Sequence, residues 1–412
     1  MARADLAHPA LALAACSANL SFDEALAIIA NDALPIGTER IPLSRAGRRI
    51  LAEPILARID APRFDVAAMD GYAMRASDLD VGTRAFDLAG QSYPGSAAPL
   101  PIGPCQVAKV TTGAALPAGA TQVVPWEHVT VIGGTVVVRN LPARRHIRER
   151  GSDFSIGDEL LPAGRMIDPR ALAVAAAADM ATLTVWRRPR VKVIATGNEL
   201  IASGLARTTQ LHQPDSLSAA IELFVRQWGG RPSGRHLLPD DLSAIERAAA
   251  DAIGNRDVLV LIGGASMGER DFAKAALEQI GLQIRFSKVA IKPGKPVWYG
   301  RIGDTHVLGL PGNPTAALTT ARLFLAPLLT ALGGRRADSA LRWSNAPLAS
   351  DIPANGDREA FLCAAWGDDG VRLVERQSAS SQMTLGLAEV LVRRAQNVSA
   401  ADVGQEVEIV RF

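Results

Sequence analysis

Residues 191–197 read VKVIATG, a continuous apolar run that ends in a glycine and is followed by the helical pattern SLSAAIELFVRQWGG at 216–230. Strand and helix patterns then alternate toward the C-terminus. They are DDLSAIERAAADAIG (240–254), DVLVLIGG (257–264), DFAKAALEQIG (271–281), HVLGLPG (306–312) and NPTAALTTARLFLAPLLTAL (313–332). This alternation is typical of a doubly wound parallel sheet, in which ligands bind beyond the carboxyl ends of the strands.

The sequence on either side of this α/β segment has a different pattern of apolar and polar residues. SFDEALAIIA (21–30) and DPRALAVAAAADM (168–180) read as helices, whereas the residues between them alternate in short β runs such as QVAKVTTG and TVVVRN. The last ~80 residues also alternate with a period of two. We expect a discontinuous N-terminal linker or dimer domain at 18–50 and 150–184, a β-rich insertion at 51–149, the α/β domain at 185–333 and a C-terminal β domain at 334–412.

Composition limits the classes of function. The 412 residues are 48% hydrophobic, and 44 basic against 42 acidic residues give a net charge of +2. This balance favours neither nucleic acid nor an acidic membrane as a partner. No run approaches the ~18 apolar residues that a membrane span needs. PALALAAC (9–16) resembles the end of an export signal, but the negative charge of Asp5 offsets the positive charge of Arg3 that such a signal needs. Three scattered cysteines suit a reducing compartment. We therefore expect a cytoplasmic protein.

The segment IKPGKP (291–296) carries two lysines on a stiff piece of backbone. Pro293 and Pro296 remove backbone donors, which makes the segment a poor central strand. Lys292 and Lys295, as compact point charges, suit a tetrahedral oxyanion or a phosphate. Solvated surface lysines remain the alternative interpretation.

Other motifs follow the predicted strands. LIGGASMGERDF (261–272) and LGLPGNPTAAL (308–318) bring glycines and helix starts to the predicted crevice, although ordinary turns and helix caps explain both motifs equally well. Glu199, in ATGNEL, could coordinate Mg²⁺ beside a phosphate or begin a helix. In the insertion, Asp65 and Asp70 lie in a segment that is too apolar for an exposed loop, so we expect them to be buried and to have partners. Thr112 and Asp153 have weaker claims, and RRHIRERG (144–151) is a local basic patch.

Five of these motifs, MDGYA, TGNEL, GGASMGERDF, AIKPGKP and LPGNP, occur in this order over some 250 residues. In this respect the chain resembles the molybdopterin molybdenumtransferase family, MoeA, which includes the E domain of gephyrin. The resemblance implies a four-domain, elongated, L-shaped homodimer with active sites shared between subunits. It also implies that molybdate is inserted into adenylated molybdopterin with Mg²⁺, giving molybdenum cofactor and AMP.

The same resemblance implies roles for individual residues. Molybdate would contact Lys292, Lys295, Pro296, Arg358 and Ser381. Molybdopterin and the nucleotide would contact Thr112, Gly197, Gly263, Gly264, Ser266, Gly312, Asn313 and Pro314. Glu199, Asp271 and either Asp240 or Asp241 would place Mg²⁺, and catalysis would depend on Glu199, Asp65, Asp271 and Asp153.

The chain departs from the usual family pattern at Asn198, Ala67, Ala316 and the pair Gln213–Pro214. Two other functions therefore stay open: a non-catalytic escort that binds molybdopterin or its cofactor, and a molybdopterin adenylyltransferase. The partners implied by the resemblance are a second copy of the chain, the adenylyltransferase of the pathway and apo-molybdoenzymes.

Overall fold

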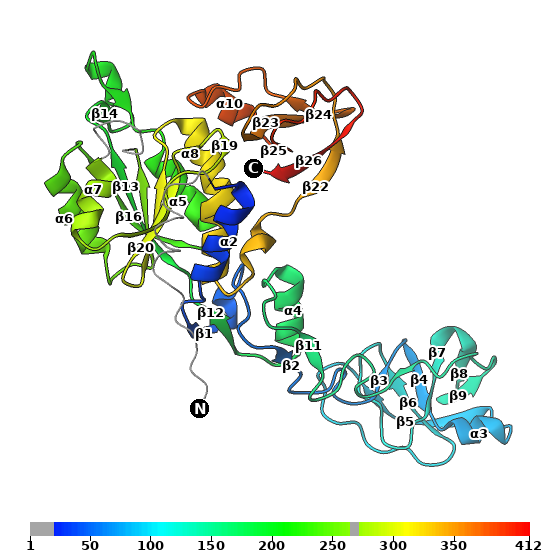
Figure 1. Ribbon diagram of the computed structural model, residues 1–412. Helices are drawn as coiled ribbons and strands as arrows, with labels where there is room; N and C mark the ends of the chain where they lie inside the picture. Colours follow the sequence, from blue (N-terminus) through cyan, green and yellow to red (C-terminus); the bar gives the residue numbers. More distant parts are fainter. Residues whose placement is uncertain (1–19, 264–271) are drawn as a thin grey trace, which may run out of the picture. The chain divides into compact units, whose positions relative to one another are not determined.

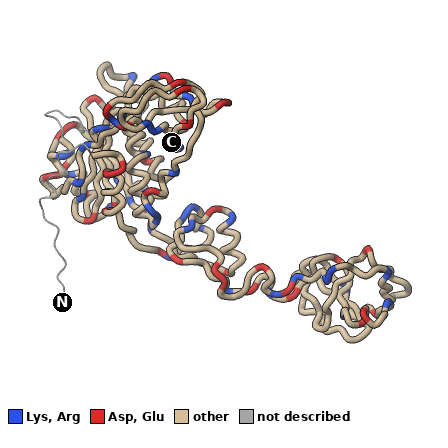
Figure 2. Tube along the Cα trace, turned by 45° about the vertical axis from the view of Figure 1, so that its right-hand side comes forward, with Lys and Arg blue, Asp and Glu red and all other residues tan. Residues whose placement is uncertain are grey.

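The computed structural model describes residues 20–263 and 272–412 (Figure 1). The chain divides into two compact units. Unit 1 comprises Met1–Glu39 and Trp186–Phe412, and unit 2 comprises Arg40–Val185. Basic and acidic residues are interspersed along both units (Figure 2), in agreement with the small net charge.

A six-stranded sheet forms the centre of unit 1. In spatial order the strands are β16 (Arg231–Leu238), β13 (Arg190–Thr196), β17 (Val258–Ile262), β21 (Thr305–Leu310), β20 (Trp298–Ile302) and β18 (Gln283–Phe286). Four neighbouring strands are parallel, as expected, and the next strand, β20, pairs antiparallel with β21 on one side and with β18 on the other.

Helices cover both faces of this sheet, so the doubly wound architecture is confirmed. On one face lie α5 (Ser218–Gln227) and a long helix made of α8 (Pro314–Thr320), the π-helical turn η4 (Ala321–Leu325) and α9 (Ala326–Leu332). On the other lie α6 (Leu242–Ala252) and α7 (Phe272–Gln279). Along β13 the side chains alternate accordingly: Val191 and Val193 join the first core and Ile194 the second.

The sheet order also locates the crevice. The chain leaves β13 for β16 on one side and then returns to β17 on the other side of β13. Such a reversal of strand order is the topological switch point at which ligands bind in open α/β sheets. Gly197 follows β13 and Gly263 follows β17, so both glycines lie at this crevice.

Helix α2 (Phe22–Asp32) begins with a capping box. Ser21 Oγ accepts from Glu24 N at 3.2 Å, and Ser21 N donates to Glu24 Oε2 at 2.8 Å. The buried face of the helix packs on unit 1, where the Phe22 ring lies 5.1 Å from the Phe361 ring and 5.7 Å from the Phe324 ring. The expected discontinuous domain required residues 20–39 to pack with residues 150–184. Instead, the apolar face of residues 20–39 completes the core of unit 1.

The C-terminal residues form a second six-stranded sheet within unit 1. It has a core of its own, but Phe361, Cys363, Leu391 and Val410 join the α/β core, so packing is continuous across the expected boundary at 333/334. The helical turn η5 (Ala337–Ala340) precedes the sheet and helix α10 (Gln382–Leu387) lies beside it. The strands are β19 (Ile291–Lys292), β23 (Glu359–Gly367), β25 (Val390–Arg394), β26 (Glu406–Arg411) and β22 (Ser344–Pro347), with β24 (Gly370–Leu373) paired to β23.

Unit 2 has one core built from its chain ends and two smaller cores in the insertion. The first core combines residues 41–55 with residues 160–185 and includes α4 (Pro169–Ala177), which Asp168 caps through Ala171 N at 2.8 Å. Its strand pairs are β1 (Thr38–Pro42) with β12 (Thr182–Trp186) and β2 (Ile55–Leu56) with β11 (Glu159–Leu161), and η1 (Leu43–Arg45) follows β1.

The insertion is a six-stranded sheet in the order β7-β4-β6-β5-β9-β8. Short helices α3 (Ala76–Asp80) and η2 (Trp126–His128) lie at its ends, and β3 (Val66–Ala67) pairs with β10 (Ile147–Arg148) beside it. The strands are β4 (Gly71–Met74), β5 (Ala85–Ser92), β6 (Gln106–Val110), β7 (Gln122–Pro125), β8 (Val129–Ile132) and β9 (Thr135–Val138).

One helix in the described part of the chain is long and apolar enough to cross a membrane, which the sequence analysis did not anticipate. It is the 19-residue helix Pro314–Leu332, and 94% of its apolar window is buried within the protein. Its composition reflects its position in the core of unit 1, between the sheet and α2.

Candidate functional site

Two of the predicted anion-binding residues line one cavity of unit 1. The cavity has a volume of about 480 Å³ and is lined by Ala290, Lys295, Asp357, Arg358 and Gln396. Lys295 and Arg358 are 63 positions apart in the sequence (358 − 295), so the fold has to bring them together. A site with two cationic side chains and a carboxamide can hold an oxyanion.

The KPGKP turn reaches this cavity because it is attached to the C-terminal sheet. Strand β19 pairs with β23 in the register Ile291↔Glu359, and Glu359 N donates to Ala290 O at 3.0 Å. Gly294 has φ +108°, and a Cβ added to it would lie 2.3 Å from the Thr320 methyl group. The glycine between the prolines is therefore required by backbone conformation and by the close approach of α8.

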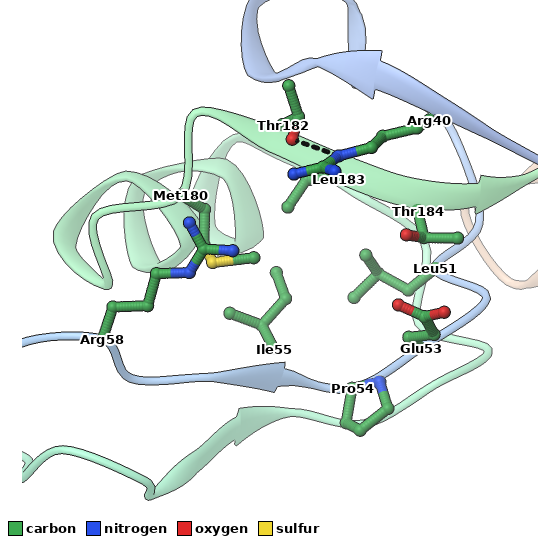
Figure 3. Close-up of a pocket in the computed structure, with 10 residues that line it drawn as sticks. All are labelled: Arg40, Leu51, Glu53, Pro54, Ile55, Arg58, Met180, Thr182, Leu183 and Thr184. Atoms are coloured by element: carbon green, nitrogen blue, oxygen red, sulfur yellow. Dashed lines mark hydrogen bonds between the residues drawn. The ribbon is translucent and has the colours of Figure 1, made fainter.

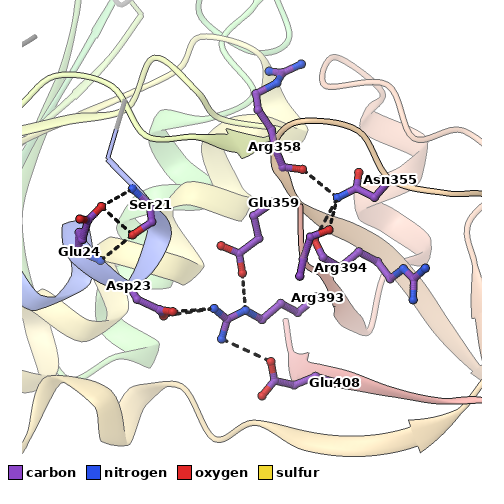
Figure 4. A network of polar contacts seen from close by, with 10 residues as sticks. Ser21, Asp23, Glu24, Asn355, Arg358, Glu359, Arg393, Arg394 and Glu408 are labelled. Carbon is purple, nitrogen blue, oxygen red and sulfur yellow. Dashed lines mark hydrogen bonds and ion pairs between the residues drawn. The ribbon is translucent and has the colours of Figure 1, made fainter. Parts of the chain in front are cut away.

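Asn355 joins the two loops that carry Arg358 and Gln396. Its Nδ2 donates to Arg358 O at 2.8 Å and to Ala395 O at 2.7 Å, with Arg394 O at 3.1 Å (Figure 4). The backbone reinforces this link, because Asn397 N donates to Gly356 O at 2.8 Å. The relative position of the cationic and the amide group in the cavity thus rests on the Asn355 side chain together with backbone bonds between the two loops.

A polar network next to the cavity fixes β23 to α2 (Figure 4). Arg393 pairs with Glu359, with Asp23 at 3.0 Å and with Glu408 at 3.4 Å. Burial raises the pKa of Glu359, and its bond with Arg393 opposes that shift. The Arg393 guanidinium also lies 5.2 Å from the centre of the Phe22 ring, which adds a cation–π contact.

The cationic groups of the cavity are poorly neutralised. Lys295 forms no ion pair with any residue that the structure describes. Arg358 lies 3.9 Å from Asp357, whose side chain is 94% exposed, so solvent screens that pair. The cavity therefore has a net positive potential that favours an anion.

Other residues predicted to bind molybdate lie elsewhere. Lys292 is exposed and Pro296 is half-buried, and neither lines the cavity. Ser381 is the N-cap of α10: its Oγ accepts from Thr384 N at 3.4 Å, and its carbonyl accepts from Thr315 Oγ1 at 2.7 Å. Ser381 therefore caps α10 and does not line the cavity, and its contact with molybdate stays a prediction.

The N-terminus of α8 also differs from the expectation of an anion site. Asn313 occupies the N-cap position and Pro314 begins the helix, as predicted, but the Asn313 side chain makes no capping bond. Thr315 N at 2.9 Å and Ala316 N at 3.2 Å both donate to Ala379 O. A carbonyl of the C-terminal domain thus occupies the donors that would attract an anion, while Gly312 stays exposed.

At the carboxyl end of the α/β sheet, Asn198 and Asp240 bind each other reciprocally. Asp240 N donates to Asn198 Oδ1 at 3.1 Å, and Asn198 N donates to Asp240 Oδ2 at 3.4 Å. This pair places Asp240 beside the exposed Glu199. Asp241 instead caps α6 by accepting from Ala244 N at 2.7 Å, so Asp240 is the member of the pair that remains for a metal.

The described residues include no group of three or more His, Cys, Asp or Glu that could hold a metal. Gly264, Ser266 and Asp271 lie outside the described residues. Of the two described glycines at the crevice, Gly263 has φ +91°, and a Cβ on it would lie 2.6 Å from Thr196 O. The backbone approach between β13 and β17 thus requires this glycine.

Unit 2 contains the remaining predicted residues, in two places. Asp65 Oδ1 accepts from Arg150 N at 2.8 Å, and Asp153 N donates to Ala61 O at 2.9 Å, so both acids lie where the two connections to the insertion run side by side. Thr112 lies at the end of β6 and donates to Asp70 Oδ1 from its N at 2.7 Å and its Oγ1 at 2.9 Å.

Asp65 and Asp70 have partners, as predicted, but both are exposed rather than buried. Two hydrogen bonds from Thr112 hold the pKa of Asp70 below its usual range, and the bond from the Thr112 backbone N–H has the larger effect. The apolar residues around these acids, such as Val66, pack inward while the acids face solvent.

A second cavity, of about 260 Å³, lies in the first core region of unit 2 (Figure 3). Ten residues line it, and the charged side chains of Arg40, Glu53 and Arg58 lie around its apolar side chains. Arg40 Nε donates to Thr182 Oγ1 at 2.7 Å. No residue that the sequence analysis selected lines this cavity.

Fold and site together define a multidomain protein with a doubly wound α/β domain, a β insertion and a cavity lined by a lysine and an arginine. Residues 20–178 match the model of the MoeA N-terminal region (domain I and II), and residues 192–331 match that of a probable molybdopterin-binding domain. The chain belongs to the molybdopterin molybdenumtransferase (MoeA) family, whose members are transferases of molybdenum cofactor biosynthesis.

Individual relatives cover most of the chain. It is 35% identical to a molybdopterin molybdenumtransferase of Haemophilus influenzae over 77% of each chain. It is 33% identical to one of Synechococcus elongatus over 88% of this chain and 92% of that protein. A crystal structure of a molybdopterin biosynthesis MoeA protein from Pyrococcus horikoshii matches with a TM-score of 0.83 and 28% identity, covering 96% of this chain and 99% of that one.

Proposed function

We propose that this protein inserts molybdate into adenylated molybdopterin and releases molybdenum cofactor and AMP. The observation that carries the proposal is the cavity in which Lys295 and Arg358 meet without strong neutralising partners. Molybdate is a tetrahedral dianion, and two fixed cationic groups lower the free energy of its bound state. Family membership supplies the reaction class, and the cavity supplies a site for the anion.

The chemistry needs no sulfur ligand from the protein. Two dithiolene sulfurs of molybdopterin replace oxygens of molybdate, and soft sulfur ligands of this kind are what molybdenum would otherwise take from cysteine. Cys363, the buried cysteine near the C-terminal sheet, has its pKa raised to about 12 by burial, which keeps it a thiol. Water then attacks the adenylate phosphorus, the phosphoanhydride P–O bond breaks with the molybdopterin phosphate as leaving group, and the adenylyl group is released as AMP.

Glu199 and Asp240 are the residues proposed to hold Mg²⁺. Mg²⁺ is usually bound through one or two carboxylates together with substrate phosphate oxygens, so the exposed Glu199 and the half-buried Asp240 at the sheet end suffice. When bound there, the ion would neutralise charge on the phosphoanhydride. The Asn198–Asp240 pair keeps Asp240 in place, so asparagine at position 198 is compatible with this role.

We also propose that the protein is a homodimer, and that Asp65, Thr112 and Asp153 of one copy complete the site of the other. This proposal rests on the family resemblance and on the placement of these residues in unit 2, whereas Glu199, Lys295 and Arg358 are in unit 1. Action in the cytoplasm and transfer to apo-molybdoenzymes stay predictions.

AMP release from adenylated molybdopterin, measured with Mg²⁺ and with or without molybdate, tests the proposed reaction. We expect molybdate-dependent release by the wild type and a loss of at least tenfold in kcat/KM for Lys295→Gln and for Glu199→Gln. Lys288→Gln, an exposed lysine outside the cavity, is the matched control and should retain full activity. No release by a wild type that still binds molybdopterin would favour the escort, and formation of adenylated molybdopterin from ATP would favour the adenylyltransferase.

A further inference from the structure

Four strands of the insertion sheet have an end at the same edge, meaning the edge that runs across the strands. Aromatic and polar residues lie just beyond these strand ends. Strand β4 begins at this edge, whereas its antiparallel neighbours β6 and β7 end there, and β5 ends there because it is parallel to β6. The residues just beyond these strand ends are Asp70, Thr112, Trp126 and Tyr93.

Trp126 is held at this edge by the backbone of the Asp70–Thr112 pair. Trp126 N donates to Asp70 O at 3.3 Å, and the Asp70 carboxylate accepts both bonds from Thr112. The Trp126 side chain is nonetheless 41% exposed. A large aromatic ring that remains this exposed, on a segment whose backbone is fixed, is available to a ligand.

Lys109 adds a positive charge to the same place. Lys109 lies on β6, which β4 separates from β7, and its Nζ is 5.3 Å from the centre of the Trp126 ring. Lys109 is half-buried and forms no ion pair with any described residue. An ammonium group over an indole is a cation–π pair, and it also leaves the charge free to approach a phosphate.

We propose that Trp126 and Lys109 form a binding platform for a planar heteroaromatic ring of the phosphorylated substrate, with the ring stacked on Trp126 and a phosphate near Lys109. This proposal rests on the proposed function, whose substrate contains two such rings, adenine and the pterin. Stacking on an aromatic side chain is insensitive to the pattern of hydrogen-bonding groups, so the shared chemistry is the flat ring joined to a phosphate.

Trp126→Ala tests the platform, with Trp126→Phe as the conservative variant and AMP, ribose 5-phosphate and molybdopterin as probes. Loss of base stacking typically weakens binding by about tenfold to hundredfold. We expect Trp126→Ala to weaken binding of AMP, or of molybdopterin, by this factor while binding of ribose 5-phosphate is unchanged, and Trp126→Phe to restore part of the loss. The probe whose binding is weakened identifies the ring that stacks on Trp126.

Intrinsic fluorescence gives a second readout. A ring stacked on Trp126 should quench part of the tryptophan emission of the wild type and none in Trp126→Ala. Trp366→Phe, which removes an indole that is 47% exposed on the C-terminal sheet, is the matched control and should leave the ligand-induced quenching intact. Lys109→Met should weaken binding of AMP and of ribose 5-phosphate alike, because it removes the charge and not the ring.

Unchanged dissociation constants for both AMP and molybdopterin in Trp126→Ala would overturn the platform. Equal weakening of all three probes, ribose 5-phosphate included, would also overturn it, since that result indicates a general structural effect. Failure of the proposed reaction is distinguishable from failure of the platform. A wild type without molybdate-dependent AMP release can still bind the probes through Trp126.

Discussion

A chain of three polar side chains, of which Tyr299 and His306 are buried and Asp32 is half-buried, ties α2 to the α/β sheet. Tyr299 Oη lies 2.7 Å from both Asp32 Oδ2 and His306 Nδ1. Because the hydroxyl has one proton and the carboxylate can only accept, His306 Nδ1 must be the protonated nitrogen. Arg301 and Arg285 lie 3.4 and 3.8 Å from Asp32 and balance its charge. Burial raises the pKa of Tyr299, so the hydroxyl stays protonated at all physiological pH values.

This arrangement predicts that acid destabilises unit 1. Burial, and then Arg301, lower the pKa of His306 to about 4, against 6.5 for an ordinary histidine. The unfolded chain therefore binds a proton that the folded chain does not, and stability is fully present above pH 6.5 and is lost as the pH falls toward 4. The loss amounts to at most about 3 kcal/mol, since one pKa unit corresponds to ~1.4 kcal/mol.

Urea unfolding at pH 7, 5.5 and 4 measures this effect. His306→Gln should flatten the pH dependence of the free energy of unfolding, whereas His212→Gln, at an exposed position in a loop, should not. Identical pH slopes for the wild type and His306→Gln would show that this histidine does not carry the acid sensitivity.

At the scale of elements, the site depends on a junction between loops. Asn355→Ala removes the donor that joins the carbonyls of Arg358 and Ala395, and leaves them without their partner. We expect the KM for molybdate to rise about tenfold, corresponding to ~1.4 kcal/mol, while the dissociation constant of AMP is unchanged. Asn345→Ala, on the exposed side of β22, is the control. A KM equal to that of the wild type would mean that the backbone bond between Asn397 and Gly356 positions the loops by itself.

Elements with a strong local signal could be predicted from the sequence. The Ser21 cap with Glu24, the Asp168 cap with Pro169, and the prolines and glycine around Lys292 and Lys295 all act through their immediate neighbours. Strand β16 was missed because Pro232 and Gly234 interrupt its pattern, which the sheet tolerates because β16 is an edge strand.

Features that depend on distant pairing gave no sequence signal. The cavity needs the register between β19 and β23 to bring Lys295 to Arg358, and the exposed ring of Trp126 is recognisable only once β4, β6 and β7 end together. Ser381 was assigned to the anion site on resemblance alone, and the capping bond of its hydroxyl to α10 could not be read from the sequence either. Side-chain roles that local geometry fixes were thus more predictable than roles that tertiary contacts fix.

At the scale of the whole molecule, segment order indicated where the sequence pattern changes but not the extent of each core. Phe22 and Phe361 are more than three hundred residues apart and pack at 5.1 Å, so unit 1 is completed by an N-terminal helix and by the C-terminal sheet. An apolar helix face shows that a partner exists without showing which one. The expected domain boundaries at 50/51 and 333/334 therefore mark changes in the sequence pattern and not the limits of the packed cores.

The proposed sharing of sites between two copies makes a prediction that an arrangement within one chain cannot reproduce. Asp65→Asn disables a residue of unit 2, and Glu199→Gln disables a residue of unit 1. If each site takes unit 1 from one copy and unit 2 from the other, a mixed dimer of the two variants has one site in which both residues are intact. Dimers of either variant alone have none.

We therefore expect that coexpression of the two inactive variants, purified through two different tags, restores molybdate-dependent AMP release to about half of the wild-type rate per dimer, since one of two sites is intact. A mixture of Glu199→Gln with Lys295→Gln, both in unit 1, is the matched control and should stay inactive, because the unit 1 half of every site then carries one defect. If the Asp65→Asn and Glu199→Gln pair is equally inactive although the mixed dimer forms, each site is built within one chain, and Asp65 must act on the Glu199 of its own copy.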